Sequence, residues 1–193
     1  MIEYIKGKII TVNPSFAIME TNHIGYFINI SLNTFSALKK DSEQQLFIHE
    51  VIREDTHALY GFIKEEERTI FRHLISVSGI GANTARLILS SLTPAELQEA
   101  IASANVSLIK QVKGIGLKTA QRLVIDLKDK IGKLSVDDNF LTVSNNTIKN
   151  ESLSALIALG FSKKQIEKTV DKILAEHVDI SVENLIKEVL KNQ

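Results

Sequence analysis

A nine-residue pattern occurs twice in the middle of the chain, and its two glycines could build a binding site for phosphate. The first copy, residues 77–85 (VSGIGANTA), matches the second, residues 112–120 (VKGIGLKTA), at an offset of 35 residues. Two glycines separated by one apolar residue allow a sharp turn, because glycine adopts positive φ and has no Cβ. The amides of such a turn, together with the free amides that begin the next helix, favour a phosphate oxygen.

Side chains beside the two turns could strengthen this contact. Lys118 and Arg122 lie one helical turn apart and could add cationic contacts to a nucleic-acid backbone. The predicted DNA-binding residues are Gly79, Ile80, Gly81, Asn83, Thr84, Lys113, Gly114, Ile115, Gly116, Lys118, Thr119 and Arg122. A single Gly-x-Gly is more often a plain helix end, but two copies in the same helical context favour phosphate binding. A dinucleotide site is excluded, since each pattern follows a predicted helix and lacks a third glycine.

The elements that position these turns follow from the spacing of apolar residues. Residues 1–63 alternate at the strand period, which predicts five short strands over 2–12, 16–20, 25–31, 45–52 and 58–62, with a short helix over 34–40. Gly7 is interpreted as a bulge or bend. Strands this short and this closely spaced favour a closed barrel, because closure removes unpaired edges.

The rest of the chain has helical periodicity, interrupted once. Residues 64–133 predict helices on both sides of each glycine turn, and Thr93 begins another with a capping box. Residues 134–149 are rich in Ser, Asn, Asp and Thr and are predicted to be a flexible linker. Residues 150–193 predict three helices, with Gly160 ending the first, a capping box at Ser162 beginning the second and Ser181 capping the third. A unit this small would suit a docking module.

Composition excludes several other classes of protein. The 193 residues contain no Cys, so disulfides, thiol nucleophiles and Cys-ligated metals are excluded. The five histidines lack metal-like spacing, and neither a Walker motif nor Gly-x-Ser-x-Gly is present, so we expect no cofactor, no metal and no catalytic residue. No apolar run approaches the roughly 18 residues of a membrane span. The N-terminus is unlike a signal peptide, which predicts a cytoplasmic protein.

The formal net charge of zero is a sum of unequal regions. Residues 64–133 carry 11 basic and 7 acidic residues, whereas residues 1–63 carry 5 and 7. The positive charge therefore lies in the region that holds the two glycine turns. Because this charge is modest, one copy should bind weakly, and tight binding would need several copies acting together.

The order of these segments resembles the RuvA family, the Holliday-junction-binding subunits of bacterial branch-migration complexes. The resemblance covers essentially the whole chain. It rests on residues 1–7 (MIEYIKG), Arg53–Asp55, Leu59–Phe62, Glu67 and Arg68 with Phe71, both helix–hairpin–helix motifs and residues 155–161 (ALIALGF). It implies an α+β fold of four segments: an OB-type five-stranded barrel (1–63), an all-α tandem helix–hairpin–helix domain (64–133), the linker (134–149) and a UBA-like three-helix domain (150–193).

The resemblance also implies a function without catalysis. It implies structure-specific, sequence-independent binding of four-way DNA junctions by a homotetramer or double tetramer, with the hairpins on the minor-groove side of the duplex arms. The C-terminal domain would dock on the hexameric ATPase RuvB, which drives branch migration in recombination and DNA repair. The resolvase RuvC is a further candidate partner, and no membrane is involved.

Individual residues acquire roles from the resemblance. Glu54 and Asp55, which by themselves indicate only a solvated acidic turn, match the family's acidic pin and would repel phosphates at the junction centre. The candidate motor-docking residues are Leu156, Leu159, Gly160 and Phe161, around an expected exposed apolar patch. Lysine is common in the family at the positions of Asn83 and Leu117. Asn83 could still bind a phosphate, whereas Leu117 could not, and Lys113 could compensate.

Two other function classes stay open from the residues alone. A hairpin-containing nuclease or polymerase accessory subunit would need a carboxylate cluster for two metal ions, and the sequence shows none. A protein–protein adaptor would use its hairpins only for packing against protein.

Overall fold

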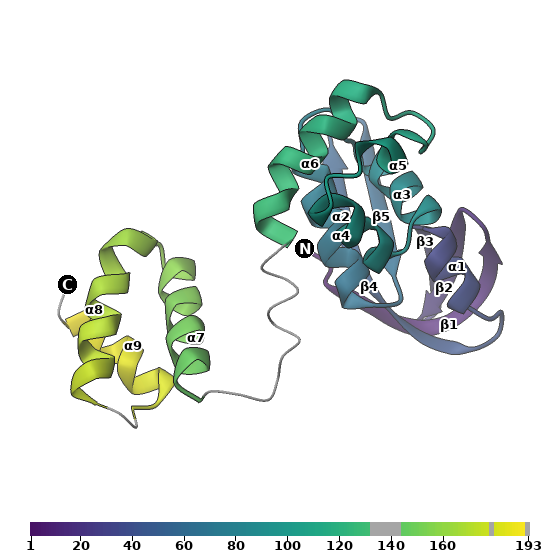
Figure 1. Cartoon of the computed structure of the whole chain (residues 1–193). Helices are drawn as coiled ribbons and strands as arrows, with labels where there is room; N and C mark the ends of the chain where they lie inside the picture. The colour runs from purple at the N-terminus through teal and green to yellow at the C-terminus, as the bar shows by residue number, and fades with distance from the viewer. Residues whose placement is uncertain (132–143, 178–179, 192–193) are drawn as a thin grey trace. The chain divides into compact units, whose positions relative to one another are not determined.

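The structure is a computed structural model that describes residues 1–131, 144–177 and 180–191. The chain forms two compact units, residues 1–137 and residues 138–193 (Figure 1). Among the described residues, the first unit holds a β-barrel and six helices, and the second holds three helices.

The barrel has five strands and a short helix between the third and fourth. These are β1 (Tyr4–Asn13), β2 (Phe16–Thr21), β3 (Ile24–Ile30), α1 (Leu32–Ala37), β4 (Glu43–Arg53) and β5 (Thr56–Phe62). The strands close in the order β1-β2-β3-β5-β4, with β3 and β5 parallel and the other pairs antiparallel. Alternate residues of β1, from Ile5 to Ile9, face the buried interior. The predicted closed barrel is confirmed.

The expectation of a bulge at Gly7 was wrong. The register between β1 and β2 shifts between Ile9 and Thr11 instead. Gly7 marks a close approach of two strands, since a Cβ there would lie 2.2 Å from the carbonyl oxygen of Glu20.

Five helices follow the barrel in the described chain and form a hydrophobic core that includes Tyr60 and Phe62 of β5, while the barrel interior forms a second core of its own. They are α2 (Glu65–Ile75), α3 (Ala82–Ser91), α4 (Pro94–Ala102), α5 (Val106–Lys110) and α6 (Leu117–Ile131). Of these, α2 packs against β4 and β5 (Figure 1). The core joins the elements through aromatic rings, because Phe71 of α2 lies 5.1 Å from the ring of Tyr60 and 4.9 Å from that of Phe62. The predicted capping box at Thr93 is confirmed. The two helices that begin with the glycine turns, α3 and α6, are thus part of one packed body.

The second unit is a small helical domain with its own core. Its helices are α7 (Ser144–Ala158), α8 (Lys163–Glu176) and α9 (Val182–Lys191). Because α7 begins at Ser144, the predicted linker was wrong over residues 144–149, and its remainder, 134–143, lies outside the described residues. Gly160, with φ of 98°, follows the end of α7 as predicted. Ser181 caps α9, whereas the side chain of Ser162 bonds to Gln165 rather than to a backbone amide, so the second predicted capping box is absent.

Candidate nucleic-acid interface

The two glycine turns have the same backbone conformation. The first glycine of each, Gly79 or Gly114, lies in the left-handed region with φ of 91° and 89° respectively. The amide of the following isoleucine donates to a carbonyl three residues earlier, at 3.0 Å for Ile80 and 3.1 Å for Ile115. Both isoleucine side chains are buried and hold the turns against the core. The repeat seen in the sequence is therefore a repeat in structure.

The second glycine of each turn leaves the start of the next helix open. Gly81 is the N-cap of α3, with φ of −87° and no side-chain cap. The helical hydrogen bonds begin with Ala85 and Ala120, whose amides donate to Gly81 and Gly116 at 2.9 Å, so the preceding amides lack helical partners. A Cβ on Gly81 or Gly116 would meet nothing within 4 Å. The space beside each of these glycines is therefore open, and a phosphate could come close to the backbone there.

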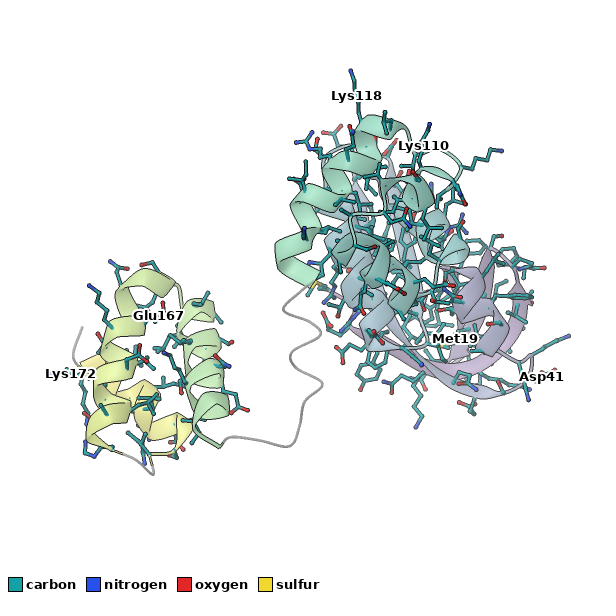
Figure 2. All side chains as sticks on the ribbon, in the orientation of Figure 1. Met19, Asp41, Lys110, Lys118, Glu167 and Lys172 are labelled. Atoms are coloured by element: carbon teal, nitrogen blue, oxygen red, sulfur yellow. The ribbon has the colours of Figure 1, made fainter. Side chains whose placement is uncertain are left out.

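Cationic side chains surround the second turn. Lys113, Lys118 and Arg122 are exposed, and Figure 2 shows Lys118 directed outward at the start of α6, with Lys110 at the same end of the unit. In the described part of the chain, neither Lys113 nor Lys118 makes an ion pair. The Nε of Arg122 lies 3.6 Å from the carboxylate of Asp126, a weak exposed pair. The predicted cations are thus available at the second turn.

The polar side chains that follow the glycines are arranged less uniformly. Thr84 and Thr119 are half-buried and Asn83 is exposed. The hydroxyl of Tyr60 donates to Oδ1 of Asn83 at 3.1 Å.

Hydrogen bonds attach the first hairpin to the barrel. The guanidinium of Arg86, on α3, donates to the carbonyl of Ser15 at 2.7 Å. The side-chain amide nitrogen of Asn33, on α1, donates to the carbonyl of Leu89 at 2.6 Å. These pairs lie 71 and 56 residues apart in the chain, so no local pattern in the sequence could have predicted them.

Arg68 joins α2 to the barrel from a buried position. Its guanidinium donates to the carbonyl of Glu3 at 2.9 Å and to the carboxylate of Glu65 at 2.6 Å, and lies 5.3 Å from the ring centre of Phe47. A hydrogen bond from Arg68 to the Glu3 side chain holds the pKa of that carboxyl below its ordinary value. Removing Arg68 would therefore remove polar contacts of α2 with Glu3, the residue before β1, and with the carbonyl of Ile48 in β4.

Glu67, the neighbour of Arg68, lies in a buried network of hydroxyls. The hydroxyls of Ser31 and Thr34 both donate to its carboxylate, and both accept from backbone amides, those of Thr34 and Ile63. Each hydroxyl has one proton and directs it at Glu67, which fits a charged carboxylate. Burial nevertheless raises the pKa of Glu67. This network connects α1 of the barrel with α2.

Comparison with known proteins decides the family. Family models match three segments: the RuvA N terminal domain at residues 1–61, the SAM-like helix-hairpin-helix tandem at 71–129 and the RuvA C-terminal domain at 147–192. The chain is 51% identical to the Holliday junction branch migration complex subunit RuvA of Christiangramia forsetii, over 99% of both chains. Proteins of that name from Flavobacterium psychrophilum and Bacteroides fragilis (strain ATCC 25285) are 48% and 49% identical, over 100% and 99% of both chains. The chain belongs to the RuvA family.

The two residues that the RuvA resemblance assigns to an acidic pin lie in the turn between β4 and β5. Glu54 and Asp55 form this two-residue turn, since Arg53 and Thr56 on either side are paired across the hairpin. Both acids are exposed, and in the described chain neither makes an ion pair. The carboxylate of Asp55 accepts only from the adjacent Thr56 hydroxyl, at 3.0 Å. The turn therefore presents two negative charges to solvent.

The residues proposed from the RuvA resemblance for motor docking are only partly exposed. Leu159 is 61% exposed, Gly160 is exposed and Phe161 is half-buried against the core. Leu156 is fully buried, so its assignment as a docking residue was wrong: it lies on the inward face of α7. The neighbouring Ile157, which is 45% exposed, was not among the candidates, because periodicity alone did not show which face of α7 is covered.

Two further features of the described residues bear on the function. No helix there is long and apolar enough to span a membrane. No group of three or more His, Cys, Asp or Glu side chains there could hold a metal ion.

Proposed function

We propose that this chain binds four-way DNA junctions through the backbone amides of both hairpins and positions the RuvB motor for branch migration. The duplicated turn carries the proposal, because two identical open helix starts present amide donors at Gly81 and Gly116. Such donors contact phosphates and do not read bases, so binding follows the shape of the DNA. The relatives' name, Holliday junction branch migration complex subunit, supports this substrate.

Several copies of the chain act together in this proposal. A homotetramer or double tetramer would present eight or more hairpins to one junction, which compensates for the modest charge of each copy. Large apolar side chains on the barrel surface support self-association, since Ile24, Phe27 and Ile52 are all more than half exposed. The subunit itself is non-catalytic and acts in the cytoplasm, ATP is hydrolysed by RuvB, and RuvC is a further partner.

The acidic turn has a separate task in this proposal. Glu54 and Asp55 repel phosphates at the junction centre and keep the strands apart as the arms move. Replacing both with Gln and Asn should preserve junction binding and change the rate at which the motor moves the junction. An unchanged branch-migration rate with RuvB would contradict this role.

The exposed patch of the C-terminal unit is the proposed docking surface for RuvB. Leu159→Asp should abolish binding to RuvB and leave the melting temperature unchanged, because Leu159 is 61% exposed. Leu156→Ala is the matched control, since it empties a core position and should cost about 2–5 kcal/mol of stability. Retained RuvB binding by a folded Leu159→Asp chain would contradict the assignment.

The experiment that tests the function is a metal-free gel shift with the full chain. A four-way junction, a fork and a linear duplex of the same sequence are compared, with a second junction of scrambled sequence as the control. We expect the two junctions to bind equally and more tightly than the fork or duplex. Equal affinity for junction and linear duplex would overturn the proposal. Metal-dependent cleavage would favour the nuclease alternative, and no binding at low salt would favour the adaptor.

A further inference from the structure

Asn83 occupies the place in the first hairpin that Lys118 occupies in the second. Each is the second residue of the helix after its turn, and the two are 35 residues apart, the offset of the repeat. A lysine is a free cation, whereas an asparagine amide is neutral and offers one acceptor and two donors. The amide can serve a phosphate only through its nitrogen, so the orientation of Asn83 matters.

Tyr60 fixes that orientation. Its hydroxyl donates to Oδ1 of Asn83 at 3.1 Å, which occupies the acceptor and leaves Nδ2 free. In the described part of the chain, Nδ2 of Asn83 has no hydrogen-bond partner, and the side chain is exposed. The planar amide therefore offers both N–H donors to a ligand at the start of α3.

The tyrosine is well suited to this task because it is buried and packed on several sides. Its side chain is buried, its ring packs 5.1 Å from that of Phe71, and its backbone lies in β5 between Asn29 of β3 and His49 of β4. Burial raises the pKa of the Tyr60 hydroxyl, which keeps the proton that it donates. The acceptor of Asn83 is thus bound to a rigid group.

We propose that Tyr60 is a positioning residue for DNA binding, which orients Asn83 so that its amide nitrogen donates to a phosphate at the first hairpin. This inference rests on the proposed junction binding. It gives the first hairpin a neutral, preoriented donor in place of a cation. Such a donor releases no counterion, so its contribution should be insensitive to salt.

A double-mutant cycle on junction affinity tests the inference. Tyr60→Phe should lower the affinity by roughly three- to tenfold, because the amide must then be ordered on binding. Asn83→Ala should lower it at least as far, and the double variant should bind no more weakly than Asn83→Ala alone. Tyr26→Phe, which removes the hydroxyl of a half-buried tyrosine in β3, is the matched control and should leave the affinity unchanged.

A charge exchange at position 83 provides a second readout, which separates positioning of Asn83 from a merely structural role of Tyr60. Tyr60→Phe should leave the slope of log affinity against log salt unchanged. Asn83→Lys should steepen it by about 0.9 and make the affinity indifferent to Tyr60→Phe. A loss of affinity from Tyr60→Phe that persists in the Asn83→Lys chain would show that the tyrosine acts through the fold and not through Asn83.

The possible outcomes separate the inference from the proposed function. A wild-type chain that binds no junction would overturn both. If the wild-type chain binds and Tyr60→Phe causes equal losses with and without the Asn83→Ala substitution, the tyrosine acts only through stability and the inference alone is overturned. A loss from Tyr60→Phe only in the chain that retains Asn83 is the result that we expect.

Discussion

The two hairpins share one backbone conformation and differ in the charge of the side chains beside their turns. Their first glycines have φ of 91° and 89°, and their helices begin at the same place relative to the turn. Where the second hairpin has Lys113, Lys118 and Arg122, the first has Ser78, Asn83 and Leu87. The amide donors are therefore duplicated, whereas these three cations occur only in the second copy. Arg86 of the first hairpin donates to the carbonyl of Ser15 instead.

The two hairpins also differ in how they are held. Arg86 and Asn33 bond the first hairpin to the barrel, and Tyr60 reaches it from β5. For residues 106–128, which include the second turn, the described chain shows no side-chain hydrogen bond to the barrel. The difference suggests a division of work, in which the first hairpin fixes the direction of the DNA relative to the barrel and the second supplies the charge.

The largest loss of junction affinity should come from side chains that block the N-terminal ends of α3 and α6. Gly81→Val and Gly116→Val place a side chain where the chain itself has open space, so folding should be unaffected and junction affinity should fall at least tenfold in each. Gly114→Val is the contrasting variant, since its positive φ adds about 1–3 kcal/mol of strain. Affinity is measured by gel shift and stability by melting. Full affinity in either open-position variant would refute the amide contact at that hairpin.

Removing the cations of the second hairpin should make junction affinity less dependent on salt. Replacing Lys113, Lys118 and Arg122 with Gln should lower the slope of log affinity against log salt by about 0.9 for each phosphate that is no longer neutralised. The reverse exchange in the first hairpin, Ser78→Lys with Asn83→Lys, should steepen the slope by the same rule. Titrations between low and physiological salt measure both. An unchanged slope in the Gln variant would show that these cations do not touch DNA.

Weakening the attachment of the first hairpin to the barrel should reduce the preference for junctions over linear duplex more than it reduces the affinity for the junction. Arg86→Ala removes the bond to Ser15 and should lower the ratio of junction to linear-duplex affinity severalfold, because the hairpin is no longer held against the barrel. Lys110→Ala is the control, since it removes an exposed cation near the second hairpin. An equal loss of affinity for junction and duplex in Arg86→Ala would argue against an orienting role.

The smallest effect should be on the pH dependence of stability, through the buried carboxyl of Glu67 in α2. Burial raises the pKa of Glu67 above its ordinary 4.5. The carboxyl of Glu67 therefore stays protonated to higher pH in the folded chain than in the unfolded chain. Its contribution to stability is therefore lost as pH rises from about 4.5 through the raised folded pKa. Glu67→Gln lacks this titration, so the free energy of unfolding of the wild type minus that of the variant should decrease over this window. Denaturant unfolding at several pH values measures it, and a constant or increasing difference would contradict the sign.

Local sequence patterns predicted the features that depend on neighbouring residues. The strands of the barrel follow from alternation, and the hairpins follow from Gly79 and Gly114, because only a turn of that kind needs glycine at a positive φ. Periodicity could not decide which face of α7 is covered, and Leu156, one of the candidate docking residues, is fully buried.

Contacts between distant residues could not be predicted in this way. Arg86 bonds to Ser15 across 71 residues, and Tyr60 bonds to Asn83 across 23, and neither pair has a local signature. The sequence also placed residues 144–149 in a linker, because their polar composition concealed the first turns of α7.

Contact between DNA phosphates and the amides of both turns can be tested directly by NMR. The chain has nine glycines, and labelling them with ¹⁵N gives amide signals from both turns. Titration with a four-way junction should shift the amide signals of Gly79, Gly81, Gly114 and Gly116 together. Gly160, in the C-terminal unit, provides the internal control and should remain in place. If the junction binds while the four turn signals stay unmoved, the hairpins do not hold the DNA through their backbone.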